Sequence, residues 1–172
     1  PEMSVKQRIL SHEYDEIVKE RYSDFGHMDL IVRQARTLGL SPEQALNVEP
    51  LPSTRATLYA WGWMTRERHW LEGLSALMAT EWANDDRYFA ELGGGVSRRE
   101  GVRWLEDMGL KWEQVPNLAA HAEADEDHSE LFVPVLAEFG SGNEGQILQA
   151  ASESMQLYRV FRLGLALAME SI

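Results

Sequence analysis

The sequence contains no cysteine among its 172 residues. This absence excludes disulfide bonds, zinc sites with thiolate ligands, iron–sulfur clusters and a cysteine nucleophile. A metal ion bound by this chain would therefore be held by nitrogen and oxygen atoms, which histidine and carboxylate side chains supply.

Basic residues are also scarce. Lysine and arginine number 16 against 28 aspartates and glutamates, and the formal net charge is −12. This balance opposes binding to phosphate backbones and anionic lipids, so we expect neither a nucleic-acid partner nor a membrane partner. No apolar run approaches the roughly 20 residues of a membrane span, and the start of the sequence lacks the features of a signal peptide. We expect a cytoplasmic protein that acts on a small molecule.

Hydrophobic residues recur with a period of about 3.6 in several segments and nowhere with a convincing period of two, which predicts an all-α fold. The length and the short breaks favour one helical bundle over residues 1–172. The expected helices run from about Ser4 to Tyr22, from His27 to Gly39, from a capping Ser41, from a capping Ser53 to Trp82 with a kink between Thr65 and His69, from a capping Ser97 to Met108, from Pro116 to Phe139 and from Gln146 to Glu170.

One expected helix contains three potential metal ligands, because His121, Asp125 and His128 stand at positions i, i+4 and i+7. This spacing directs the three side chains to one helix face. The residues that continue that face are apolar: Leu118, Phe132 and Val135. Three polar groups thus interrupt a core stripe, which favours a metal site. The alternative is a solvated acidic face, which the neighbouring Glu123, Glu126, Asp127 and Glu130 favour.

Carboxylates occur at two further unexpected places. Glu81 lies in an apolar helical segment, where a lone carboxylate costs several kcal/mol unless it is paired, protonated or bound to a cation. Glu20 precedes His27 by seven residues, across the expected connection between two helices. Carboxylate and imidazole ligands without sulfur suit iron or manganese, and helical bundles of this kind are the usual frame of di-iron carboxylate proteins.

The order of these residues resembles that of the heme-oxygenase-like di-metal oxidases, within the fold superfamily of thiaminase II and pyrroloquinoline-quinone synthase. Four stretches make up the resemblance: Lys19-Glu20-Arg21-Tyr22 with His27, Leu38-Gly39-Leu40-Ser41, Ala76-Leu77-Met78-Ala79-Thr80-Glu81 and His121-Ala122-Glu123-Ala124-Asp125-Glu126-Asp127-His128-Ser129. The family pattern of Glu and His, then Glu, then His-x3-Asp-x2-His is filled at every position. The resemblance spans roughly residues 17 to 165.

The resemblance implies a heme-oxygenase-like bundle of about seven helices, commonly a homodimer, that binds two Fe(II), or manganese, and activates dioxygen. Relatives oxidise small substrates by N-oxygenation of amines, by oxidative cleavage of amino acids or by decarboxylation of fatty acids. By position, the metal ligands would be Glu20, His27, Glu81, His121, Asp125 and His128. Glu81 is the expected bridging carboxylate among them.

Other residues are weaker candidates. Tyr158 and Arg162 lie at i and i+4 of the last helix on an apolar stripe, so they could bind a substrate carboxylate or form a structural ion pair. Tyr22 lies beside Glu20 and could approach the metals or pack against a helix. His12 and His69 have no partner at ligand spacing in their own segments, and we expect both to be structural or surface residues.

Two other functions remain open from the sequence. A metal-free relative on the same fold is one, although thiaminase-like hydrolysis would need a cysteine nucleophile that the chain lacks. The second is a ligand-binding or protein-interaction module in which the metal site is vestigial, since a fold does not determine a function. The identity of the substrate does not follow from the sequence.

Overall fold

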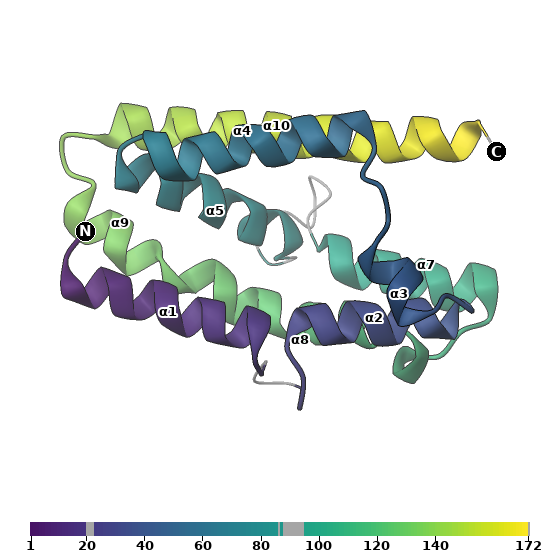
Figure 1. The fold of residues 1–172 in the computed structure, drawn as a ribbon. Helices are drawn as coiled ribbons and strands as arrows, with labels where there is room; N and C mark the ends of the chain where they lie inside the picture. The colour runs from purple at the N-terminus through teal and green to yellow at the C-terminus, as the bar shows by residue number, and fades with distance from the viewer. Residues whose placement is uncertain (20–22, 86, 88–94, 172) are drawn as a thin grey trace. The chain divides into compact units, whose positions relative to one another are not determined.

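The computed structural model describes residues 1–19, 23–85, 87 and 95–171, without the side chains of 124–127. Within these residues all regular structure is helical, which confirms the predicted all-α fold (Figure 1). In the same part of the chain, no helix combines the length and the hydrophobicity that a membrane span requires.

The chain divides into two compact units. The first contains Pro1–Val48 and Trp82–Leu131, and the second contains Glu49–Glu81 and Phe132–Ile172. Each unit therefore combines two segments that are far apart in the sequence. The prediction that residues 1–172 form a single domain stays a prediction.

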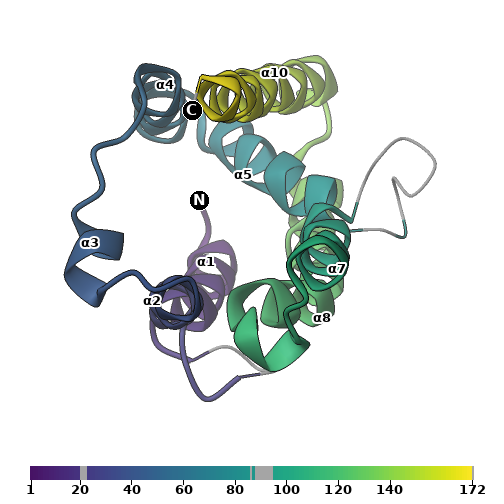
Figure 2. The ribbon, with the colours of Figure 1, turned by 90° about the vertical axis from the view of Figure 1, so that its right-hand side faces the viewer.

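Helix α8 is the centre of the first unit, because α1, α2, α7 and the 3-10 helix η2 all contact it. Figure 2 shows these helices end-on. The first unit consists of α1 (Met3–Ile17), α2 (His27–Thr37), α3 (Pro42–Leu46), α7 (Val96–Met108), η2 (Trp112–Gln114) and α8 (Pro116–Leu131), with the end of α5 (Trp70–Asn84).

Local sequence signals set several helix ends in this unit. The Ser41 side chain and the Gln44 side chain form the predicted capping box of α3. Gly109 ends α7 with a φ of 67°, a left-handed conformation that glycine adopts without steric cost. At the start of α8, the Leu118 N–H donates to Oε1 of Gln34 at 3.2 Å, so a side chain of α2 satisfies one of the open donors of that helix.

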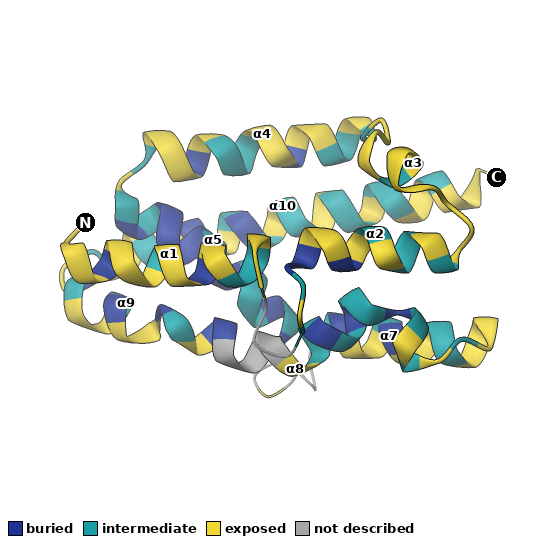
Figure 3. Cartoon of the chain, turned by 60° about the horizontal axis from the view of Figure 1, so that its bottom comes forward, coloured by how far each residue is buried: buried dark blue, intermediate teal, exposed yellow. Residues whose placement is uncertain are grey.

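Helix α1 is shorter than predicted, and several of its apolar residues are exposed. It ends at Ile17, five residues before the expected Tyr22. Its apolar residues Leu10, Tyr14 and Ile17 are more than half exposed, whereas Val5 and His12 are buried (Figure 3). The inward face of α1 is therefore mixed, because it carries the polar His12 and Glu16 as well as the apolar Val5.

The second unit is built around α4 and α10, which pack together (Figure 1). Ser154 of α10 donates to the backbone oxygen of Ala76 at 2.7 Å and accepts a hydrogen bond from Trp61 Nε1 at 3.0 Å. Both bonds join helices across the core of this unit. The second unit consists of α4 (Pro52–Glu67), most of α5, α9 (Val133–Phe139) and α10 (Glu144–Glu170).

Other helix boundaries also differ from the sequence expectation. Ser53 and Ser97 are not N-caps, because Leu51 and Gly95 hold these positions. The segment expected as one helix from Pro116 to Phe139 is interrupted at Phe132, and a proline occupies the first turn of α9, where its missing N–H costs nothing. The expected kink between Thr65 and His69 is confirmed as a break between α4 and α5.

The contact between α4 and α10 depends on a glycine. A Cβ atom at Gly164 would lie 1.8 Å from Oγ and 2.5 Å from Cβ of Ser53. We therefore expect Gly164→Ala to destabilise the protein by about 1–3 kcal/mol, as overpacking does. Gly145→Ala, in the same helix with nothing within 4 Å of its Cβ, is the control and should be neutral or stabilising by up to about 1 kcal/mol. Urea denaturation measures both, and equal effects would contradict the close contact.

Candidate metal centre

Three helices of the first unit bring four imidazoles and one carboxylate together. Among the residues that the structure describes, two groups of side chains have ligand atoms within 4.8 Å of one another, and both groups contain Glu16. Residues of these groups come from α1, from the first turn of α2 and from α8. We call them the His–Glu cluster: His12, Glu16, His27, His121 and His128.

Glu16 is the centre of this cluster. Its Oε2 lies 2.7 Å from Nδ1 of His27, while its Oε1 lies 3.8 Å from Nε2 of His12 and 3.5 Å from Nδ1 of His128. The two oxygens of one carboxylate thus face different imidazoles. This is the arrangement that a carboxylate needs to serve two neighbouring cations.

A close approach of the backbone places His27 beside Glu16. A Cβ atom at Gly26 would lie 2.5 Å from the backbone carbonyl of Ile17, where α1 ends. Only glycine fits there without a shift of the chain. His27 follows directly as the first residue of α2, so the glycine allows the start of α2 to meet the end of α1.

His27 has an unused ligand atom. The side chain is 5% exposed, and its Nδ1 is bonded to Glu16. Its Nε2 is buried and has no hydrogen-bond partner among the residues that the structure describes. The ring centroid lies 4.0 Å from that of His121 and 5.9 Å from that of His128. An unsatisfied buried nitrogen is costly, and a metal ion at this place would use its lone pair. The residues therefore fit a metal.

His121 is oriented by its own helix. Nδ1 of His121 lies 3.0 Å from the backbone oxygen of Asn117, one turn earlier in α8. A proton on Nδ1 would be donated to this oxygen and would leave the lone pair on Nε2, which is how metal-binding histidines are commonly held. His128 is buried, and its ring centroid lies 5.1 Å from that of His12.

Electrostatics favour a charged Glu16. Burial raises the pKa of this carboxyl, but the hydrogen bond from His27 and the charges of His27, His12 and His128 lower it, and the net effect is a pKa below 4.5. The side chain is 28% exposed. At neutral pH the cluster therefore contains an anionic ligand among imidazoles, as a site for divalent cations requires.

Three of the six predicted metal ligands lie in the cluster, namely His27, His121 and His128. Glu20 and Tyr22 lie outside the described residues, and the side chain of Asp125 is not described. Glu81 is half-buried and belongs to the second unit. The full set of six ligands, with Glu81 as the bridging carboxylate, stays a prediction.

Two residues of the cluster were not expected from the sequence. His12 was assigned to a structural or surface role, but it is 3% exposed and lies in a possible metal-binding group with Glu16 and His128. Their spacing of four residues, His12 to Glu16, was an available signal, since it places both side chains on one face of α1. His69, the other histidine expected to be structural or at the surface, is exposed in the second unit.

The two predicted substrate-binding residues that are described lie in the second unit. Tyr158 and Arg162 are both half-buried on α10, and their role stays a prediction. Trp63, on α4 of the same unit, is 53% exposed.

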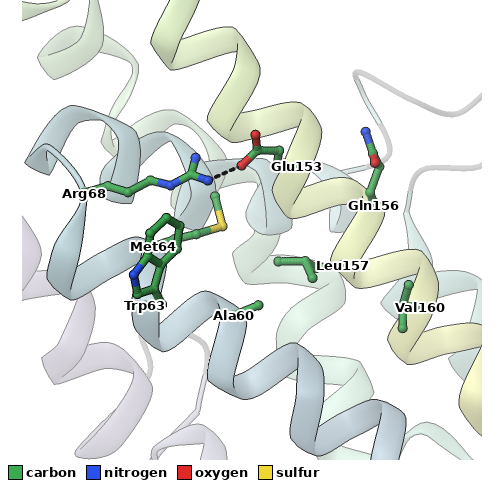
Figure 4. Close-up of a pocket in the computed structure, with 8 residues that line it drawn as sticks. All are labelled: Ala60, Trp63, Met64, Arg68, Glu153, Gln156, Leu157 and Val160. Carbon is green, nitrogen blue, oxygen red and sulfur yellow. Dashed lines mark ion pairs between the residues drawn. The ribbon is translucent and has the colours of Figure 1, made fainter.

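A groove of about 350 Å³ lies between α4 and α10 (Figure 4). Trp63 lines one end of it beside Arg68, which pairs with Glu153 at 2.5 Å and with Glu72 at 3.5 Å. The remaining lining residues are mostly apolar: Ala60, Met64, Gln156, Leu157 and Val160. None of the lining residues, all from the described part of the chain, belongs to the predicted site.

The lowered pKa of Glu16 gives a prediction for the metal-free protein. A carboxyl with a lowered folded pKa adds stability that is fully present above its unfolded pKa and is lost as the pH falls through the folded value. Glu16→Gln should therefore destabilise the protein at pH 7 by roughly 1–3 kcal/mol, and the difference should shrink as the pH falls below 4.5. Urea denaturation across this range measures it, with Glu13→Gln, an exposed position of α1, as control. A difference that does not change with pH would contradict the assignment.

Comparison with known proteins agrees with this chemistry. A family model described as an iron-containing redox enzyme matches residues 2–159, a range that includes the whole His–Glu cluster. No curated protein and no solved structure matches the chain. The family match confirms the heme-oxygenase-like part of the resemblance and indicates iron as the metal. The chain belongs to the heme-oxygenase-like family of iron-containing redox enzymes.

Proposed function

We propose that the protein is a non-heme di-iron oxidase that activates dioxygen to oxidise a small substrate with an amine or carboxylate group. The reaction would be N-oxygenation or oxidative C–C or C–N cleavage of an amino acid, or decarboxylation of a fatty acid. The observation that supports two metal ions is the position of Glu16, which is shared by two groups of ligands. His12 and His128 face one of its oxygens, and His27 faces the other.

The proposed ligand set consists of the His–Glu cluster and the three carboxylates of the sequence pattern, Glu20, Glu81 and Asp125. Asp125 lies between His121 and His128 on α8, one turn after His121. Glu20 lies between Glu16 and His27 in the sequence, in the connection that joins α1 to α2. Glu81 directly precedes Trp82, whose Nε1 donates to the backbone oxygen of Ser129 at 2.9 Å, beside His128. These positions support Glu20, Glu81 and Asp125 as further ligands.

Bound iron would supply the electrons with which dioxygen is reduced. The protein residues have other tasks. Carboxylates would balance the charge of two divalent ions, and imidazoles would hold them in a site shielded from water. Tyr22, Tyr158 and Arg162 are the proposed substrate-binding residues, in which the guanidinium would pair with a substrate carboxylate. We further propose a homodimer, on the resemblance alone.

The first test is the metal stoichiometry. The metal-free protein should take up about two equivalents of Fe(II) under anaerobic conditions and consume dioxygen on exposure to air, because the cluster provides two groups of ligands. His121→Ala and His27→Ala should each lower the uptake, whereas His69→Ala, an exposed histidine, should not. Iron analysis and an oxygen electrode measure these quantities. Absence of uptake, or uptake that both cluster variants retain, would instead favour a ligand-binding module.

The second test identifies the carboxylate ligands on and after α1. If both Glu16 and Glu20 bind iron, then Glu16→Gln and Glu20→Gln should each weaken Fe(II) binding by roughly tenfold or more, as the loss of a charged ligand does. Glu13→Gln is again the matched control. Titration with Fe(II) against a competing chelator measures the affinities. Binding that is unchanged in Glu16→Gln would remove Glu16 from the metal centre and leave the sequence-derived set.

A further inference from the structure

A polar network joins α8 to Trp82, Asp85 and Arg87 within the first unit. Ser129 donates its hydroxyl to Oδ2 of Asp85 at 2.5 Å, and its backbone oxygen accepts the bond from Trp82 Nε1 at 2.9 Å. Arg87 donates Nε and Nη2 to the Asp85 carboxylate at 3.1 and 2.8 Å, and Nη1 to Glu130 at 3.1 Å. Asp85 is 2% exposed and Ser129 is 0% exposed.

A buried carboxylate is tolerated only when its partners are well placed. Burial raises the pKa of Asp85, but hydrogen bonds from Arg87 and Ser129 and the charge of Arg87 outweigh this effect, so the pKa lies below its usual range. The charged carboxylate therefore accepts short hydrogen bonds in a defined geometry. Any rotation of Ser129 away from Asp85 would leave a buried charge with one partner fewer.

Ser129 directly follows His128 in α8. Successive residues of an α-helix are rotated by about 100° about the axis, so the two side chains leave the helix in different directions. Ser129 is held by Asp85, and His128 faces Glu16. A hydrogen bond at Ser129 therefore restrains the rotation of α8 at the position where His128 enters the His–Glu cluster.

We propose that Asp85 and Ser129 are positioning residues of the metal centre, which hold α8 so that the imidazole of His128 is directed at its metal. This inference rests on the proposed function, since it requires that His128 binds metal. Neither residue belongs to the ligand set. They act through His128, and Arg87 supports them by bonding to Asp85 and to Glu130 on α8.

The test is a titration of the metal-free protein with Co(II), which is stable in air and has visible absorption bands that depend on the ligands. Ser129→Ala and Asp85→Asn should weaken Co(II) binding by roughly tenfold or more, as the loss of residues that orient a ligand does, and should change the absorption bands. Ser154→Ala is a matched control. Ser154 is equally buried, donates to a buried acceptor, Ala76, and accepts a bond from a tryptophan, but it lies in the second unit.

Thermal unfolding of the metal-free variants separates positioning from stability. A purely structural role predicts that Ser129→Ala and Ser154→Ala both lower the melting temperature and both bind Co(II) with wild-type affinity and bands, and this result would overturn the inference. If Ser129→Ala does not fold, the near-isosteric variant Asp85→Asn is used to distinguish the two roles, again by Co(II) titration and thermal unfolding. A wild-type protein that binds no Co(II) and no Fe(II) would instead refute the proposed function, and the positioning role with it.

Discussion

The packing of α1, α2 and α8 in the first unit brings one carboxylate, Glu16, among four imidazoles. Glu16 is within 4 Å of three histidines from α1, α2 and α8, and its pKa is lowered despite burial. A carboxylate at the centre of buried imidazoles offsets part of the cost of burying these polar groups. Helix α1 directs His12 and Glu16 inward together with Val5, whereas Leu10, Tyr14 and Ile17 are exposed.

The connection before α2 and the helix α8 bring the other histidines of the cluster to Glu16. Gly26 lets the backbone approach the end of α1 closely, so His27 begins α2 next to Glu16. Helix α8 presents His121 and His128 two turns apart, and polar bonds from Gln34 near its start and from Asp85 near its end restrain it. The specific contacts that position the cluster thus lie near the ends of helices, at the start of α2 and at both ends of α8.

The sequence predicted the helices and three of the five residues of the His–Glu cluster for identifiable reasons. The i, i+7 spacing of His121 and His128 brings two side chains together within one helix, and helix periodicity alone is sufficient to show it. His27 was singled out by its spacing from Glu20 across the connection between two helices, and the family pattern then assigned it as a ligand. Glu16 and His12 were missed because the hydrophobic residues of α1 lie on its exposed side, and a pattern that normally marks the core then indicates the wrong face.

Taken by itself, the sequence determined the helical class, the absence of cysteine ligands, and the residues that belong to the family pattern, because these follow from composition and from spacing along one chain. Only the tertiary structure decided that Glu16 meets His27 and His128, that His12 is buried, and that Asp85 is bonded to Ser129. Such contacts join positions up to 112 residues apart, as Glu16 and His128 are, and depend on how helices rotate about their axes. That rotation is set by packing and by buried charge, which no local pattern in the sequence specifies.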